Sequence, residues 1–416
     1  GSILPEVDED KGEIIRLKLK SGYNAGIKIP EITSIKKLGE GKSVGKAKHM
    51  ELIHNPKLPK ISILHTGGTI ASRIDYRTGS VFSSFEPKDL ITMYPELGEK
   101  ANIDSVFLSN MWSDDLRFEH LELIAKAIQK EFEKGSKGII IGIGTDNLAV
   151  ASAGISFAVE KCPIPIIFVG SQRSSDRPSA DGAMNLICAA EFIAQTDFAG
   201  VAICMHNSTN DDKCAILPAT KTRKLHTSRR DAFKAINDSP IALVDFKTKQ
   251  IEFLKKAYTK RSNEKMIVKP KFEKKVGLLK ISIGMFPEQF ELFNKSKFKG
   301  LVIEGTGLGH TPGHSPNKEA AIHKKFFPIL AKFSKQGVIV MTSQCINGRV
   351  QMHVYDKGTD LVKLGVIPGE DMLAETAMVK LSWLLGNYKK EQVKEMIAKN
   401  LRGEITERTE HLEIVH

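Results

Sequence analysis

Short apolar runs separated by helical stretches dominate the chain from Ile61 onward. In the first half these runs are ISILHT, SVFLSN, GIIIGIGT, IPIIFVGS and GVAICMH. Apolar residues recur at helical spacing in 116–132 and in 148–159, and alternation of short apolar strands with helices is typical of a parallel α/β sheet. Each run ends in glycine or polar residues, at the edge where open α/β sheets bind ligands.

A second set of runs follows the first. It consists of VGLLKIS, GLVIEGTG and GVIVMTS, with helices expected around 374–385 and 391–400. Between the two sets, 246–274 is rich in lysine and has no such pattern. The pattern therefore predicts two unequal α/β domains with parallel sheets, 61–245 and 275–416, joined by a linker over 246–274.

The residues before Ile61 have a different pattern. Glu13 to Leu19 alternate, and a Gly-Tyr-Asn-Ala-Gly turn and a second short strand follow. This predicts a small β module over 1–35 and, because 36–60 contains several glycines and prolines, a connector. Two or three strands are too few for an independent barrel, so we expect the module to be incomplete here, with a further part before Gly1.

Two threonines stand at strand tips where catalytic groups are expected. Thr69 follows the paired glycines of His-Thr-Gly-Gly-Thr-Ile, which let the backbone turn sharply and expose amide donors. Thr145 lies in Gly-Thr-Asp at the end of the third run. A threonine hydroxyl needs a base to become a nucleophile, and Asp146 adjoins Thr145. The alternatives are an ordinary turn or phosphate loop for the first motif and a helix N-cap role for Asp146.

Lys224 opens a third motif, Lys-Leu-His-Thr-Ser. A lysine held against Thr145 and Asp146 could accept the proton that activates a hydroxyl group. Taken alone, it would be a surface residue.

Composition restricts the class of protein further. The hydrophobic fraction is 41% and the charged fraction 26%, which is ordinary for a folded domain. The five cysteines include no C-x-x-C pair, and no apolar run approaches the length of a membrane span. These features favour a reduced, cytoplasmic compartment. The net charge of +12 permits an anionic partner such as RNA, although a solvated lysine-rich surface explains it as well.

Four motifs in this order resemble the L-asparaginase/glutaminase family: TGGTI, GTD, the SxRSSDxxSxDGxxN segment at 171–185, and KxHTS. The resemblance covers about 61–401. It implies the α/β asparaginase fold, with Thr69 as primary nucleophile and Tyr76 as its hydroxyl partner. It further implies a second catalytic group formed by Thr145, Asp146 and Lys224.

The same resemblance assigns the substrate-binding groups. Ser113 and Asp114 match the positions that hold the α-carboxylate and α-amino groups of the substrate, and Gly68 and Gly144 belong to the loops around it. An N-cap role for Ser113, in a helix beginning near Leu116, is the alternative.

Two positions depart from the family pattern, which commonly reads His-Gly-Thr-Asp-Thr where this chain has Ile143 and Asn147 at the first and last places. We interpret Ile143 as strand packing and expect activity to be retained. The histidines are dispersed without ligand spacing, so no metal site is expected.

Several further segments are similar to the D subunits of archaeal glutamyl-tRNA(Gln) amidotransferases. They are the turn at 22–27, RSSDRP at 173–178, KLHTSRRDAF at 224–233 and VIEGTGLG at 302–309.

This resemblance implies a glutaminase or asparaginase without a cofactor of its own, which supplies ammonia to an E-type partner subunit. The partner would use ATP and Mg²⁺ to amidate glutamate on tRNA(Gln), mostly binding the tRNA itself, in a 2+2 heterotetramer built on a homodimer. The alternatives are a free cytosolic L-asparaginase and a catalytically impaired binding or regulatory homologue.

Overall fold

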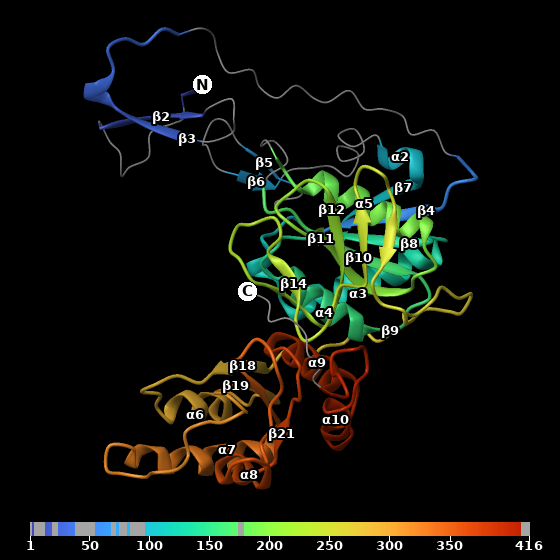
Figure 1. The fold of residues 1–416 in the computed structure, drawn as a ribbon. Helices are drawn as coiled ribbons and strands as arrows, with labels where there is room; N and C mark the ends of the chain where they lie inside the picture. The colour runs from blue at the N-terminus through green and yellow to red at the C-terminus, as the bar shows by residue number, and fades with distance from the viewer. Residues whose placement is uncertain are drawn as a thin grey trace.

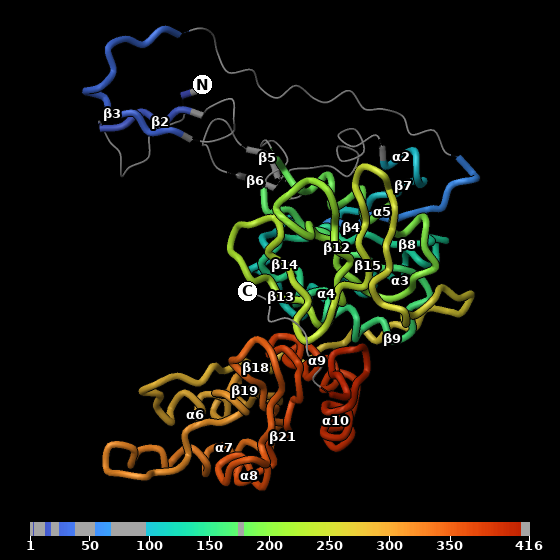
Figure 2. The backbone as a smooth tube through the Cα atoms, viewed as in Figure 1, coloured from blue at the N-terminus to red at the C-terminus, as the bar shows by residue number. Residues whose placement is uncertain are grey.

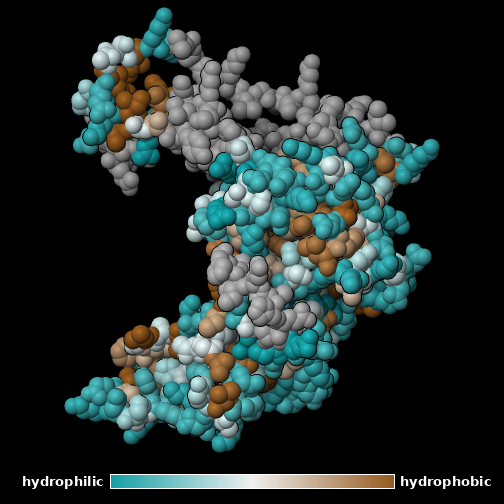
Figure 3. Space-filling view, in the orientation of Figure 1, coloured by the Kyte–Doolittle hydropathy of each residue, from teal (hydrophilic) through white to brown (hydrophobic). Residues whose placement is uncertain are grey.

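A computed structural model describes residues 2–3, 13–18, 24–37, 55–67, 72–74, 81–83, 96–173 and 179–408. Figure 1 shows two large α/β domains, with the second domain (orange to red) below the first. Figure 2 shows the same chain path as a tube. In the space-filling view hydrophilic side chains cover most of the visible face of both domains (Figure 3). No helix within the described ranges is long and apolar enough to cross a membrane.

The first domain is built on an eight-stranded sheet with the order β16-β15-β12-β11-β10-β8-β4-β7. Five neighbouring strands are parallel, as the apolar runs predict. They are β4 (Lys60–His65), β7 (Asn102–Phe107), β8 (Gly138–Gly142), β10 (Pro165–Val169) and β11 (Gly200–His206). Strand β8 is buried along its whole length, so its residues are all apolar or glycine.

The other three strands of this sheet are antiparallel, so the sheet is mixed. They are β12 (Lys213–Pro218), β15 (Ala242–Asp245) and β16 (Ile251–Phe253). Strand β16 corrects the expectation that 246–274 is a linker, because Ile251 and Phe253 pack against the core of the first domain. In the sequence, β16 is hard to recognise because it lies among lysines and, at three residues, is too short to show the alternation of a strand.

Helices cover both faces of the first sheet. They are α2 (Glu96–Lys100), α3 (Phe118–Glu133), α4 (Leu148–Ala158) and α5 (Gly182–Gln195). Helix α4 is buried almost all round because it packs on the sheet on one side and on the second domain on the other.

Short two-stranded pairs complete the first domain. They are β5 (Ser72–Ile74) with β6 (Val81–Ser83), β13 (Thr222–Lys224) with β14 (Phe233–Ala235), and β9 (Val159–Lys161) with β17 (Ile267–Val268).

The second domain has a four-stranded parallel sheet with the order β18-β19-β20-β21. The strands are Val276–Lys280, Gly300–Gly305, Val338–Ser343 and Val366–Pro368. The helices are α6 (Glu288–Lys295), α7 (Phe326–Gln336), α8 (Asp356–Lys363), α9 (Ala374–Asn387) and α10 (Lys390–Ile397). Helix α9 lies at the junction of the domains (Figure 1), where its Trp383 stacks on Phe157 of α4. One apolar core therefore runs through both domains.

The N-terminal residues form the predicted small β module. Strands β1 (Ser2–Ile3), β2 (Ile14–Lys18) and β3 (Asn24–Lys28) make an antiparallel sheet. Asn24, Ala25 and Gly26, which we expected in the turn, pair with β2 instead. The strand therefore begins earlier than the turn residues suggested.

Candidate active site

The candidate site lies where the carboxyl ends of β4, β8 and β10 meet in the middle of the first sheet. Thr66 follows β4, and both its amide and its hydroxyl group bond to the carbonyl of Gly142, the last residue of β8. Thr145 comes three residues after that glycine, and Gln172 follows β10. The three loops thus converge at the edge of the sheet that binds ligands in folds of this class.

Thr145 is at the centre of this edge. Its side chain is buried, and Lys224 Nζ donates to its Oγ1 over 2.8 Å. The Thr145 hydroxyl in turn donates to Gln172 Oε1 at 3.1 Å. A hydroxyl group held by a lysine on one side and an acceptor on the other is oriented for proton transfer.

Asp146 pairs with the same lysine, since Lys224 Nζ lies 2.9 Å from Asp146 Oδ1. Its carboxylate is two-thirds exposed and makes no side-chain cap of α4, whose N-cap residue is Asn147. The lysine comes from the end of β13 and is 15% exposed. The structure therefore brings together Thr145, Asp146 and Lys224, and it does not support the N-cap alternative for Asp146.

Ser113 and Asp114 lie in a short 3-10 helix (Ser113–Asp115) beside Thr145. Asn147 donates from its side chain to the Ser113 carbonyl over 2.7 Å, and its backbone amide lies 3.4 Å from Ser113 Oγ. A Cβ on Gly144 would come within 2.8 Å of the same hydroxyl oxygen, so only glycine fits there. Helix α3 begins later, after Arg117, so Ser113 is not its N-cap.

The two positions that depart from the family pattern have structural roles. Asn147 holds the Ser113 loop through its side-chain bond to the Ser113 carbonyl. Ile143 is 1% exposed and belongs to the core shared by the two domains. The interpretation of Ile143 as strand packing agrees with this burial.

Thr69, Gly68 and Tyr76 lie outside the residues that the structure describes. The residues before them fix the direction of the chain. Gly67 has φ 101°, and a Cβ there would lie 2.6 Å from the backbone of Met111. The backbone therefore leaves β4 in a left-handed turn that favours glycine.

Gln172 and Asp181 are part of the site. From the sequence alone, Asp181 belongs to the motif at 171–185 without an assigned role, and Gln172 is not singled out. The buried Asp181 carboxylate accepts hydrogen bonds from the amides of Gln172 and Arg173 and from the Ser171 hydroxyl, at 2.9–3.0 Å. Asp181 thus shapes the loop that presents Gln172 to Thr145. The position of Gln172 directly after an apolar run was the available signal.

His65 lies at the end of β4, below the site. Burial lowers the pKa of its imidazole to about 4. Neither ring nitrogen has a hydrogen-bond partner among the described residues. The neutral ring therefore adds no positive charge beside Thr66.

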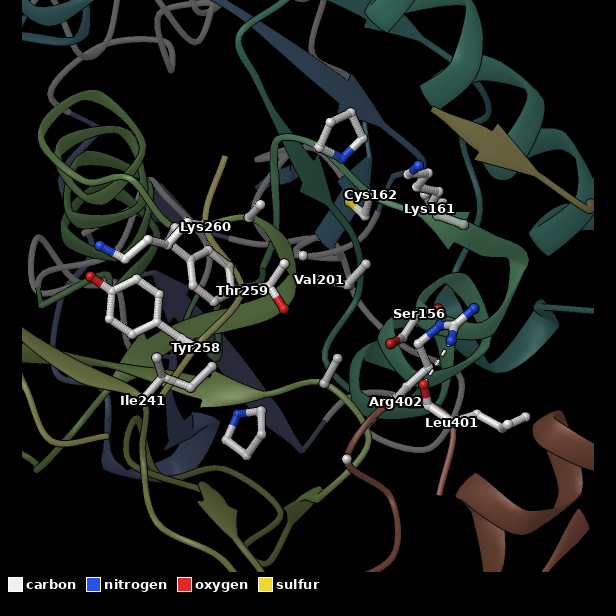
Figure 4. Close-up of a pocket in the computed structure, with 18 of the residues that line it drawn as sticks. Ser156, Lys161, Cys162, Val201, Ile241, Tyr258, Thr259, Lys260, Leu401 and Arg402 are labelled. Carbon is white, nitrogen blue, oxygen red and sulfur yellow. Dashed lines mark hydrogen bonds between the residues drawn. The ribbon is translucent and has the colours of Figure 1, made fainter. Parts of the chain in front are cut away.

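A separate cavity of about 630 Å³ lies at the amino ends of β10 and β11, on the opposite edge of the sheet. Figure 4 shows Cys162, Val201, Tyr258 and Arg402 around it. Its lysines pair with neighbouring carboxylates, as Lys161 does with Glu264 at 2.6 Å. The cavity is remote from Thr145 and takes no part in the site.

Comparison with known families identifies the fold and the family of the chain. Residues 60–259 match the N-terminal asparaginase domain, 275–397 match the glutaminase/asparaginase C-terminal domain, and 1–38 match the GatD N-terminal domain. In structure, the chain resembles the thermostable L-asparaginase from Thermococcus kodakarensis, with a TM-score of 0.72 and 28% identity over 83% of this chain and 99% of that one. It also resembles L-asparaginase I from Vibrio cholerae, with a TM-score of 0.70 and 26% identity over 84% of this chain and 99% of that one.

Full-length relatives are more similar in sequence. The D subunit of glutamyl-tRNA(Gln) amidotransferase from Pyrococcus abyssi is 44% identical over 98% of this chain and 90% of its own length. The D subunit from Methanosarcina acetivorans is 43% identical over 99% of this chain and 95% of its own length. These matches include the N-terminal module as well as both asparaginase domains. The chain therefore belongs to the family of glutamyl-tRNA(Gln) amidotransferase D subunits, which is built on the asparaginase fold.

Proposed function

We propose that the chain is the ammonia-releasing subunit of a tRNA-dependent amidotransferase. It hydrolyses the side-chain amide of glutamine, or of asparagine, and supplies the ammonia to an E-type partner subunit. The partner uses ATP and Mg²⁺ to convert glutamyl-tRNA(Gln) to glutaminyl-tRNA(Gln). The observation that carries the proposal is the contact of Lys224 with both Thr145 and Asp146 in an asparaginase fold.

In this mechanism the hydroxyl group of Thr69 attacks the amide carbon. Amides of the loop around Gly68 stabilise the oxyanion, and the Thr145–Lys224–Asp146 group moves the protons. Ammonia then leaves, and water hydrolyses the acyl-enzyme. Gly67, two residues before Thr69 in the sequence, follows β4 at the same sheet edge as Thr145, which supports a role for both hydroxyl groups. Tyr76 serves as the hydroxyl partner of Thr69.

Ser113 and Asp114 bind the α-carboxylate and α-amino groups of the substrate. Support comes from the position of Ser113 against Gly144, one residue from Thr145. The bonds from Asn147 fix the loop before substrate arrives. The chain needs no cofactor of its own for this half of the reaction, because the groups named here are all protein groups.

We further propose that two copies form a homodimer within a 2+2 heterotetramer in the cytoplasm, and that the partner makes most contacts to tRNA(Gln). Ammonia released without an acceptor is wasted, so turnover should be slow until partner and glutamyl-tRNA are bound. In the sequence, Tyr76 comes between β5 and β6, which pair antiparallel. Partner docking that closes this segment over Thr69 would need about 1.4 kcal/mol for a ten-fold rise in turnover.

Steady-state ammonia release tests the proposal on the chain alone, with its E-type partner, and with partner and glutamyl-tRNA(Gln). If turnover is coupled to the acceptor, the rate should rise in the complete assembly. An equal rate in all three would leave a free asparaginase, and no release in any of them would leave a non-catalytic homologue.

A further inference from the structure

Strands β13 and β14 form a hairpin that carries Lys224, and the second domain holds this hairpin at its base. Lys221, one residue before β13, extends its side chain to Asp371 in the loop after β21, with Nζ 2.5 Å from Oδ2. Both side chains are almost fully buried, at 0% and 2% exposure. Only two residues, Thr222 and Arg223, therefore separate a buried contact with the second domain from the lysine that touches Thr145.

The other arm of the hairpin is fixed at the same point. Asn237, just after β14, donates to the Gly348 and Asp371 carbonyls and accepts the Gly348 amide at 2.8 Å. The two arms are tied together because the Ile236 amide bonds to the Lys221 carbonyl over 2.7 Å. The residue before β13 and the second residue after β14 thus both bond to Asp371.

A third contact reaches Asp371 from the C-terminal segment. Thr406 donates its backbone amide to Oδ1 at 3.0 Å and its hydroxyl group to Oδ2 at 2.5 Å. Both oxygens of the carboxylate therefore accept hydrogen bonds, which hold it towards Lys221. Along β13 itself, Arg223 also pairs with the second domain, through Glu375 at 3.1 Å.

A buried ion pair of this kind is costly to form. Burial lowers the pKa of Lys221, whereas the hydrogen bond and charge of Asp371 and the charges of Asp238 and Glu404 oppose that shift. Apolar residues of similar volume often stabilise a fold as well as a buried pair does, so such pairs are better suited to fixing one arrangement than to adding stability. The arrangement fixed here is the register of β13 against the second domain.

That register determines whether Lys224 reaches its partners. Strand residues advance about 3.3 Å each, so even a fraction of a one-residue shift would break contacts of 2.8 and 2.9 Å. We propose that Lys221 and Asp371 are positioning residues for amide hydrolysis, through which the second domain sets Lys224 against Thr145 and Asp146. This inference rests on the proposed function of that group.

The test uses Lys221→Met, which keeps an unbranched side chain shorter by one atom and removes its charge. Lys380→Met is the matched control. Lys380 is also 0% exposed and pairs with a buried carboxylate, Glu404, at 2.6 Å, and its further bonds go to the Ile397 and Lys399 carbonyls. Both variants leave a buried carboxylate without its ammonium partner, so both should lose stability, but of the two lysines only Lys221 bonds to Asp371 at the base of the hairpin.

Ammonia release is measured with the complete amidotransferase at a temperature where both variants are folded by circular dichroism. Lys221→Met should lower kcat by about 10- to 100-fold, with KM for glutamine within about three-fold. The dependence of kcat on pH should also change, because Lys224 is displaced from Thr145 and Asp146. Lys380→Met should keep the wild-type profile. Equal losses of kcat in the two variants without a change of profile, or wild-type kcat in both, would overturn the inference.

Two further variants complete the test. Asn237→Gly removes the second anchor without backbone strain, since φ at this position is 53°, and it replaces Lys221→Met if that variant does not fold. It should show the same shift of profile in weaker form, and a wild-type profile would count against the inference. Lys224→Ala tests the proposed function separately, because wild-type kcat in that variant would refute the site itself, whatever Lys221 does.

Discussion

Replacing Thr145 with valine deletes one hydroxyl group and keeps the shape of the side chain. The deleted oxygen lies 2.8 Å from Lys224 Nζ and 3.1 Å from Gln172 Oε1. Loss of one member of a catalytic group that acts as a unit costs on the order of 10⁴-fold in kcat, or about 5 kcal/mol of transition-state stabilisation. Lys224 keeps its bond to Asp146, so the fold should lose only about 1 kcal/mol.

Thr342→Val is the matched control for this change. Thr342 is fully buried in β20 of the second domain, and its hydroxyl group donates to the Ile303 carbonyl at 3.1 Å. The same chemical change there should lower the free energy of unfolding by a similar amount, about 1 kcal/mol, and leave ammonia release unchanged. Comparing the two variants separates loss of chemistry from loss of stability.

The assay is ammonia release from glutamine and asparagine, with thermal unfolding followed in parallel. Thr145→Val should be nearly inactive with a melting temperature within a few degrees of the wild type, roughly 2–4 °C. Thr69→Val should be equally inactive if Thr69 is the nucleophile. A Thr145→Val enzyme that retains turnover within about ten-fold of the wild type would refute the assignment of its hydroxyl group to the reaction.

Three more outcomes are expected. Lys224→Ala should lower kcat by at least about 10³-fold, whereas Lys256→Ala, at an exposed lysine outside the site, should not change it. The reverse result would contradict the assignment of Lys224 to the reaction. Asn147→Ala should raise KM for glutamine by about ten-fold with a smaller effect on kcat, because Ser113 loses its support, and unchanged KM would argue against that role. The pKa of His65 is about 4 when folded and 6.5 ordinarily, so the unfolded chain binds its proton first as pH falls, and up to about 3 kcal/mol of stability is lost from pH 6.5 to 4. His65→Phe should flatten that part of the curve of melting temperature against pH, and an unchanged slope would contradict it.

The five parallel strands of the first domain could be predicted from the sequence because each contains a short run rich in apolar residues and is followed by a segment with glycine or polar residues. The antiparallel strands β12, β15 and β16 could not be predicted as such. Hydropathy does not encode strand direction, and β16 is only three residues long among lysines. The predicted linker was wrong for that reason.

The candidate site could likewise be predicted from the sequence only in part. The contact between Thr145 and Lys224 spans 79 residues, and the motif resemblance indicated it where periodicity alone could not. Lys221 would have seemed a harmless control for Lys224, since both are lysines in one polar run. The structure shows Lys221 fully buried against Asp371. Burial of a charged side chain depends on partners 150 residues away, which the local sequence does not reveal.

The C-terminal segment has a consequence for synthesis on the ribosome. Glu404 completes the buried pair with Lys380, and Thr406 completes the bonds to Asp371. These residues are translated after Lys380 and Asp371, and also after the hairpin that carries Lys224. A nascent chain that has exposed the whole first domain therefore still lacks the last partners of two buried charges. Domains generally fold in the order in which they emerge, but here the bonds that hold the Asp371 carboxylate are complete only after residue 406 has left the exit tunnel.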